Sequence, residues 1–180
     1  AWQDRFPVSI TPSHAGVPNA TLGRFSMRGT VFGPAMQLYD DAGANFATYY
    51  IGLDFEGAGW KHCVWTYNDT TKAIYFYLNG VRQDWTKWGG TPSNVPYLTA
   101  TGYSYNSDLK IGTNTGSYFF EGKIDGVATW DTLLDAATIL SLYNSGVPNS
   151  LLLAASYTAG GGTDKSGDLQ GYWRMGEGST

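Results

Sequence analysis

Asn79-Gly80 separates two runs of strand-forming residues, at 73–78 and 81–83. An Asn-Gly pair readily supplies the two positive-φ residues of a type I′ turn, whose twist matches that of two paired strands. The pair therefore predicts an antiparallel hairpin with these two runs as its arms.

Other strand-like runs recur along the chain between turn-forming residues. They cover residues 35–39, 45–53, 60–67, 109–112, 118–130 and 172–175. The run at 118–130 contains Gly122 and Gly126, and we expect a bend at one of them. Aromatic residues make up 16% of the chain, charged residues 14%, and glycine 24 of 180 positions. This combination is typical of an all-β domain with tight turns.

One short helix is expected at 135–143. Asp135 is a suitable N-cap, and Leu134 and Ile139 occupy the two positions of a hydrophobic staple around it. Gly146 and Pro148 then end the helical pattern. The apolar run at 151–157 is not assigned to a second helix.

The charge balance restricts the kind of partner. Fifteen acidic and eleven basic residues give a net charge of −4, which disfavours binding to nucleic acid or to an anionic membrane. No apolar run of membrane-spanning length is present, so we expect no membrane insertion. A single cysteine, Cys63, excludes a disulfide within the chain and is expected to be a small core side chain.

Four segments carry a family resemblance. Residues 60–67 read WKHCVWTY, residues 74–81 IYFYLNGV, residues 109–112 LKIG and residues 120–130 FEGKIDGVATW. In this order they resemble the W-H-v … l-Y-l-N-G and l-x-I-G … F-x-G-x-I-D-x-v-x-x-W segments of laminin-G-like domains, members of the concanavalin A-like lectin/glucanase superfamily. The resemblance covers residues 60–146. It implies an antiparallel jelly-roll β-sandwich with one short helix.

The ends of the chain fit this resemblance less well. Opening strands are hard to find in residues 1–33, and GYWRMGEG at 171–178 looks like the opening of such a domain placed at the C-terminus. We therefore expect a sandwich over 1–157, followed at 158–180 by a Gly-rich linker and a terminal strand or by the start of a further module. Residues 143–148 and 171–176 are similar to laminin-G-like segments of phage structural proteins, which implies a virion origin.

Catalytic motifs are weak in this sequence. Glycosidases of the superfamily carry E-x-D-x-E or E-x-D-x-x-E, and Glu121 with Asp125 is the nearest pair. Ser107 and Lys110 fit S-x-x-K but lie where a strand is expected rather than a helix. His62 is expected to be structural rather than a general base. We therefore expect no catalysis, with a glycoside hydrolase at Glu121 and Asp125 as the alternative.

The resemblance also suggests a calcium ion, which many relatives hold at the sandwich rim with oxygen ligands. Loop-end carboxylates could provide such ligands here: Asp40, Asp41, Asp54, Asp69 and Asp108, together with Asn106. They form no contiguous ligand loop, and Asp and Asn are ordinary turn formers. Calcium therefore remains a hypothesis.

The segment 84–107 is unusually aromatic for a Gly- and Pro-rich stretch, which is too irregular for one continuous strand. Its candidate ligand-contact residues are Asp84, Trp85, Trp88, Asn94, Tyr97, Tyr103, Tyr105 and Asn106. Flat aromatic faces with nearby polar groups suit sugars, but the same rings could pack inward or contact protein.

These observations predict a non-catalytic module on a virion (capsid decoration or fibre) or in an extracellular structural protein. It would act in attachment, glycan contact or assembly, located outside the cell or on the virion surface. The alternative is a purely structural subunit that self-assembles, as a homo-oligomer or within a larger assembly.

Overall fold

The computed structural model describes residues 5–12, 25–30, 33–39, 46–50, 59–68, 73–83, 86–90, 107–112, 120 and 122–175. Side chains are described at 59–66, 75–83, 111–112, 120 and 122–175. The chain divides into two compact units, one from residues 1–56 and 85–122 and the other from 57–84 and 123–180. Each unit is described by itself. Within these described ranges no helix is long and apolar enough to cross a membrane.

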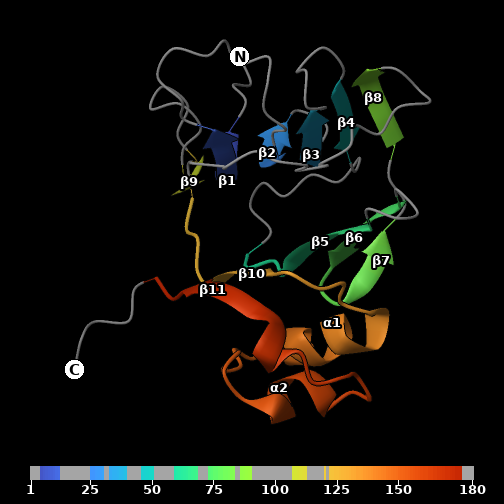
Figure 1. The fold of residues 1–180 in the computed structure, drawn as a ribbon, viewed down its shortest axis with the longest axis vertical. Helices are drawn as coiled ribbons and strands as arrows, with labels where there is room; N and C mark the ends of the chain where they lie inside the picture. Colours follow the sequence, from blue (N-terminus) through green and yellow to red (C-terminus); the bar gives the residue numbers. More distant parts are fainter. Residues whose placement is uncertain are drawn as a thin grey trace. The chain divides into compact units, whose positions relative to one another are not determined.

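The first unit contains a six-stranded sheet in the order β8-β4-β3-β2-β1-β9. Its neighbouring strands pair antiparallel throughout. The strands are β1 (Arg5–Pro12), β2 (Phe25–Thr30), β3 (Gly33–Tyr39), β4 (Phe46–Tyr50), β8 (Thr86–Gly90) and β9 (Ser107–Ile111). The predicted strands at 35–39, 45–53 and 109–112 are confirmed as β3, β4 and β9, with shifted ends. The six strands are visible in Figure 1.

Three strands of this sheet were not predicted, β1, β2 and β8, and for the first two the reason is local. In β1 the pairing with β2 shifts register between Arg5 and Val8, around Pro7. A proline cannot donate to the ladder and is accommodated at such an irregularity, so the strand lacks the usual signal. In β2 the apolar residues Phe25 and Met27 alternate with polar neighbours, which is the pattern of a half-buried strand. The strand has only six residues, so the alternation is short.

The second unit combines two small sheets with helices. One sheet has the order β5-β6-β7, from β5 (Cys63–Asn68), β6 (Ala73–Leu78) and β7 (Val81–Gln83). The other pairs β10 (Val127–Trp130) with β11 (Leu169–Trp173) antiparallel. In Figure 1, α1 (Ala136–Tyr143) lies between the β5–β7 strands and α2 (Ala154–Thr158). Two 3-10 turns complete the unit, η2 (Asn144–Gly146) and η3 (Ser166–Asp168).

The predicted hairpin and helix are both confirmed. Asn79 and Gly80 have φ of 52° and 76°, and Leu78 pairs with Val81 across the turn. The Asp135 carboxylate caps α1 by accepting a hydrogen bond of 2.7 Å from the Thr138 backbone N–H. This bond is the first cause of the lowered pKa of Asp135.

The core of the second unit forms where the helices meet the β5–β7 sheet. Leu134 and Ile139, the staple pair, are buried there with Leu142, Tyr77 and Tyr157. Val64, Tyr75, Trp130 and Leu151 pack around them. On the other face of the sheet the rings of Trp65 and Phe76 lie 4.6 Å apart. The alternation predicted for 60–67 therefore places Val64 and Trp65 on opposite faces, as observed.

Two expectations about the second unit were wrong. The chain has a second helix, α2, where one short helix was expected. Its five residues are too few to show a helical period, so the apolar run at 151–157 had no recognisable pattern. Among the described residues of the run 118–130, only Val127–Trp130 form a strand, and the predicted bend is found at Gly126, where φ is 61°.

The Gly-rich segment after α2 packs closely on α1. The Thr163 backbone N–H donates to the Thr138 hydroxyl at 2.9 Å, and the Gly160 N–H donates to the Ser141 hydroxyl at 2.8 Å. Both hydroxyls are buried in a helix whose Leu140 is exposed. A Cβ at Gly162 would lie 2.4 Å from both the Thr138 Cα and the Tyr157 carbonyl oxygen. Glycine is therefore required there by close approach.

Gly162→Ala should destabilise the fold by about 1–3 kcal/mol, because backbone atoms on both sides cannot move aside cheaply. Urea unfolding followed by circular dichroism measures this change. Gly167→Ala is the matched control, since a Cβ there would have no neighbour within 4 Å. We expect no loss of stability in the control; equal losses in the two variants would contradict close packing at Gly162.

Candidate functional site

The segment proposed from sequence as a ligand contact begins on an edge strand. Trp88 lies in β8 opposite Thr48 of β4. The segment 84–107 is thus not irregular throughout, because Thr86–Gly90 forms a strand. Aromatic and β-branched residues favour a strand there, and an edge position tolerates the two glycines that end it. The other predicted contact residues lie outside the described residues: Asp84, Trp85, Asn94, Tyr97, Tyr103, Tyr105 and Asn106.

The two ends of this segment belong to opposite edges of the six-stranded sheet. β8, which holds Trp88, is the first strand in the order, and β9, which begins at Ser107, is the last. With strands about 4.8 Å apart, these edges are about 24 Å from each other. Trp88 and Ser107 therefore lie at opposite edges of the sheet.

Of the carboxylates considered for calcium, only Asp108 lies among the described residues. It lies on β9 and pairs with Thr11 of β1. Asp40, Asp41, Asp54 and Asp69 lie outside the described residues. Among the residues whose side chains are described, no group of three His, Cys, Asp or Glu could hold a metal ion. Ser107 and Lys110 both lie in β9. They therefore lie in a strand, as expected, and not at the start of a helix, where S-x-x-K works.

His62 is part of the contact between the hairpin and α1. Its backbone N–H donates to the Asn79 side-chain oxygen at 3.0 Å, and the Asn79 N–H donates to the His62 carbonyl at 2.8 Å. Its imidazole stacks on the Tyr143 ring, with centroids 5.9 Å apart. The buried Nδ1 has no hydrogen-bond partner, and burial lowers the pKa of His62. The uncharged ring therefore suits a packing role, as the sequence indicated.

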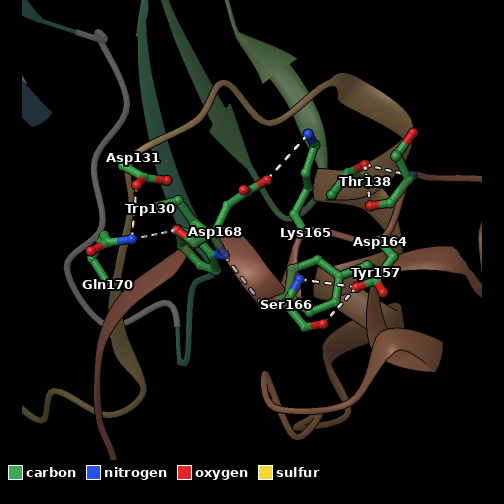
Figure 2. A network of polar contacts seen from close by, with 10 residues as sticks. Trp130, Asp131, Thr138, Tyr157, Asp164, Lys165, Ser166, Asp168 and Gln170 are labelled. Carbon is green, nitrogen blue, oxygen red and sulfur yellow. Dashed lines mark hydrogen bonds and ion pairs between the residues drawn. The ribbon is translucent and has the colours of Figure 1, made fainter.

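Figure 2 shows a polar network that the sequence did not reveal, linking the β10–β11 sheet to the helices. The Trp130 indole N–H donates to the Tyr157 hydroxyl at 3.3 Å, and this hydroxyl donates to the Leu151 carbonyl at 2.8 Å. The Gln170 amide donates to the Asp131 carboxylate at 2.9 Å. These bonds join residues from separate elements, so no sequence spacing could have identified them.

All five carboxylates within residues 122–175 have structural partners. Asp135 caps α1, and Asp131 accepts from Gln170. The remaining three bind near the C-terminal strand: Asp164 accepts from Ser166, Asp168 pairs with Lys165 at 3.3 Å, and Asp125 accepts from the Met175 N–H at 3.1 Å. The pKa of Asp164 is lowered mainly by the Ser166 backbone hydrogen bond. A general acid needs a raised pKa, and neither Asp135 nor Asp164 has one.

Two exposed aromatic rings were missed as contact candidates. Trp60 is 65% exposed just before β5, and Trp173 is 39% exposed on β11. The other aromatic side chains described by the structure are half-buried or buried. Both tryptophans lie in strand-like sequence, which does not show whether a side chain is exposed.

One comparison with known proteins gives a match. A laminin G family described as the concanavalin A-like lectin/glucanases superfamily matches residues 24–140. The matched range begins just before β2 and ends within α1, so β1 and β11 lie outside it although both pair with strands inside it. No curated protein and no solved structure matches the chain significantly.

The buried neutral His62 should make stability depend on pH. Because its pKa is lower in the folded state, unfolding takes up a proton below about pH 6.5, and stability falls as the pH decreases through that value. Between pH 6.5 and 5 the loss from this group is at most about 2 kcal/mol. Urea unfolding at both pH values should show a smaller loss in His62→Phe.

His14→Phe is the control, because His14 is the other histidine of the chain. This variant should keep the pH dependence of the native protein. The lowered pKa values of Asp135 and Asp164 act at lower pH and do not interfere. An unchanged pH dependence in His62→Phe would contradict the buried neutral imidazole.

Proposed function

Since this chain belongs to the concanavalin A-like lectin/glucanases superfamily, we propose that it is a non-catalytic surface module that contacts carbohydrate through aromatic side chains. Domains of this superfamily are β-sandwiches, and we infer a jelly-roll arrangement of the strands. The module would belong to a virion or to an extracellular structural protein and would act in attachment or assembly.

The position of Trp88 is the observation that carries this proposal. Its strand β8 is an edge of the six-stranded sheet, and the aromatic-rich segment 84–107 continues from it. In the described strand order, β8 has a neighbouring strand on one side only. An indole ring offers a flat apolar face to the C–H groups of a pyranose, with an N–H at its rim.

The carboxylates support the absence of catalysis in this proposal. Glycoside hydrolysis needs two acids facing one bond, one of them with a raised pKa. Asp125, one of the two candidate acids, is exposed and accepts a backbone hydrogen bond from Met175. This bond gives the Asp125 carboxylate a structural role at the end of β11.

A glycan array with neutral and acidic oligosaccharides tests this function directly. Binding to one or more of them is expected, and the double variant Trp85→Ala, Trp88→Ala should weaken it at least tenfold, or about 1.4 kcal/mol. Trp60→Ala is the control, since it removes an exposed tryptophan from the other unit. Reducing-sugar release that is lost in Glu121→Gln would instead establish an enzyme.

A purely structural role is the second candidate. Val147, Leu152 and Leu153 are 58–69% exposed within a short stretch around the start of α2. Clustered exposed apolar residues are typical of a surface that contacts protein. Binding to no glycan, together with a mass in solution above that of one chain, would favour this role.

A further inference from the structure

The turn of the β6–β7 hairpin is also a chemically labile point of the chain. Asn79-Gly80 is the only Asn-Gly pair in the sequence. Asparagine is a thermolabile residue, and it is lost most readily before glycine, because glycine has no side chain to hinder attack by its backbone nitrogen. The same two residues that form the turn can therefore react with each other.

The reaction needs only water and a base in solution. The Gly80 backbone nitrogen loses its proton and forms a bond to the Asn79 Cγ, the Cγ–Nδ2 bond breaks, and ammonia leaves. The product is a five-membered succinimide ring, which takes up one water. Water addition at Cγ gives aspartate, whereas addition at the backbone carbonyl gives isoaspartate, in which the main chain runs through the former side chain.

The turn geometry keeps the reacting atoms apart. The ring closes only when the Gly80 nitrogen and the Asn79 Cβ are eclipsed about the bond from Cα to the carbonyl carbon. The first residue of a type I′ turn has φ of about 60° and ψ of about 30°, and Asn79 has φ of 52°. At that ψ the nitrogen is rotated away from Cβ, so ψ must change by more than a right angle before the ring can close.

Contacts on both sides of the turn resist this rotation. The Asn79 Oδ1 accepts a hydrogen bond from the His62 N–H at 3.0 Å, and the Asn79 N–H donates to the His62 carbonyl at 2.8 Å. Gly80 is buried beside α1, where an added Cβ would lie 2.9 Å from a methyl carbon of Leu140 and 3.2 Å from the Tyr143 ring. Rotation at Asn79 must therefore break the bonds to His62 or move the turn away from α1.

We propose that Asn79 is a deamidation site that is protected by the hairpin turn and α1 and that reacts only when the turn opens. The aspartate product keeps an oxygen that can accept from the His62 N–H, and Asp-Gly also forms this type of turn. Isoaspartate adds one methylene group to the main chain, so the turn cannot re-form with the same contacts. Conversion to isoaspartate thus destabilises the second unit irreversibly. This inference goes beyond the proposed function and does not depend on carbohydrate binding.

The test measures the deamidation of Asn79 in the full chain at mildly alkaline pH, by peptide mapping with mass spectrometry. Isoaspartyl methyltransferase labels the isoaspartate product. The reaction should be at least tenfold slower in the folded protein than in the chain unfolded in urea, which corresponds to an opening free energy of at least about 1.4 kcal/mol. Equal rates would overturn the protection, and no reaction at Asn79 in the unfolded chain would overturn the site.

Leu140→Ala tests the contribution of α1 to this protection. Leu140 is 48% exposed and lies outside the buried cluster, so the variant keeps its core but loses the methyl carbon beside Gly80. Asn79 should deamidate two- to fivefold faster in this variant. Leu152→Ala is the matched control, because it truncates a leucine that is 69% exposed near α2, and it should react at the native rate. Equal acceleration in both variants would contradict protection by α1.

Leu140→Val provides a second route if Leu140→Ala does not fold. It removes less of the same contact and should give a smaller acceleration than Leu140→Ala. A native deamidation rate in folded Leu140→Val would then contradict protection by α1.

Asn79→Asp separates the two products. This variant reproduces the aspartate product without lengthening the main chain, and it should unfold at nearly the same urea concentration as the native protein. The isoaspartate fraction of the aged protein, isolated by chromatography, should unfold at a lower urea concentration. Equal stability of this fraction and Asn79→Asp would overturn the proposed effect on the second unit.

Discussion

The contact between the Asn79-Gly80 turn and helix α1 holds the second unit together. Two hydrogen bonds join Asn79 to His62, so the turn is fixed to β5 as well as to its own strands. A Cβ at Gly80 would lie 2.9 Å from a methyl carbon of Leu140 and 3.2 Å from the Tyr143 ring. Glycine thus serves twice at this position: it adopts φ of 76° and it allows the helix to approach. Without this approach, Leu134 and Ile139 could not pack against Tyr77 of the β5–β7 sheet.

The elements that could be predicted are those specified by neighbouring residues. The Asn79-Gly80 turn, the Asp135 cap and the run at 73–78 each contain their signal within a few positions, and each is found as expected. The missed elements depend on distant partners. Strand β1 contains Pro7 and is stabilised by β2 and β9 on either side, while α2 is too short to show a period.

The candidate contact residues were harder to predict because exposure depends on the fold. Aromatic residues in strand-like sequence are expected to be core, and Trp65 and Tyr77 are indeed half-buried and buried. Trp173 has the same local context but stays partly exposed. Its neighbour Tyr172 lies on the opposite face of β11, so the two rings have different surroundings. A sequence pattern gives the alternation of faces, but it does not say which face is covered.

Trp173 and Trp88 differ in how the chain positions them. The tip of the Trp173 ring lies where a side chain at residue 171 would be, so Gly171 leaves that space to the ring. At Trp88 the edge strand fixes the backbone, and further aromatic residues follow it in the sequence. Contacts through such rings suit the proposed role in attachment, because attachment does not require a transition state to be bound more tightly than the ground state.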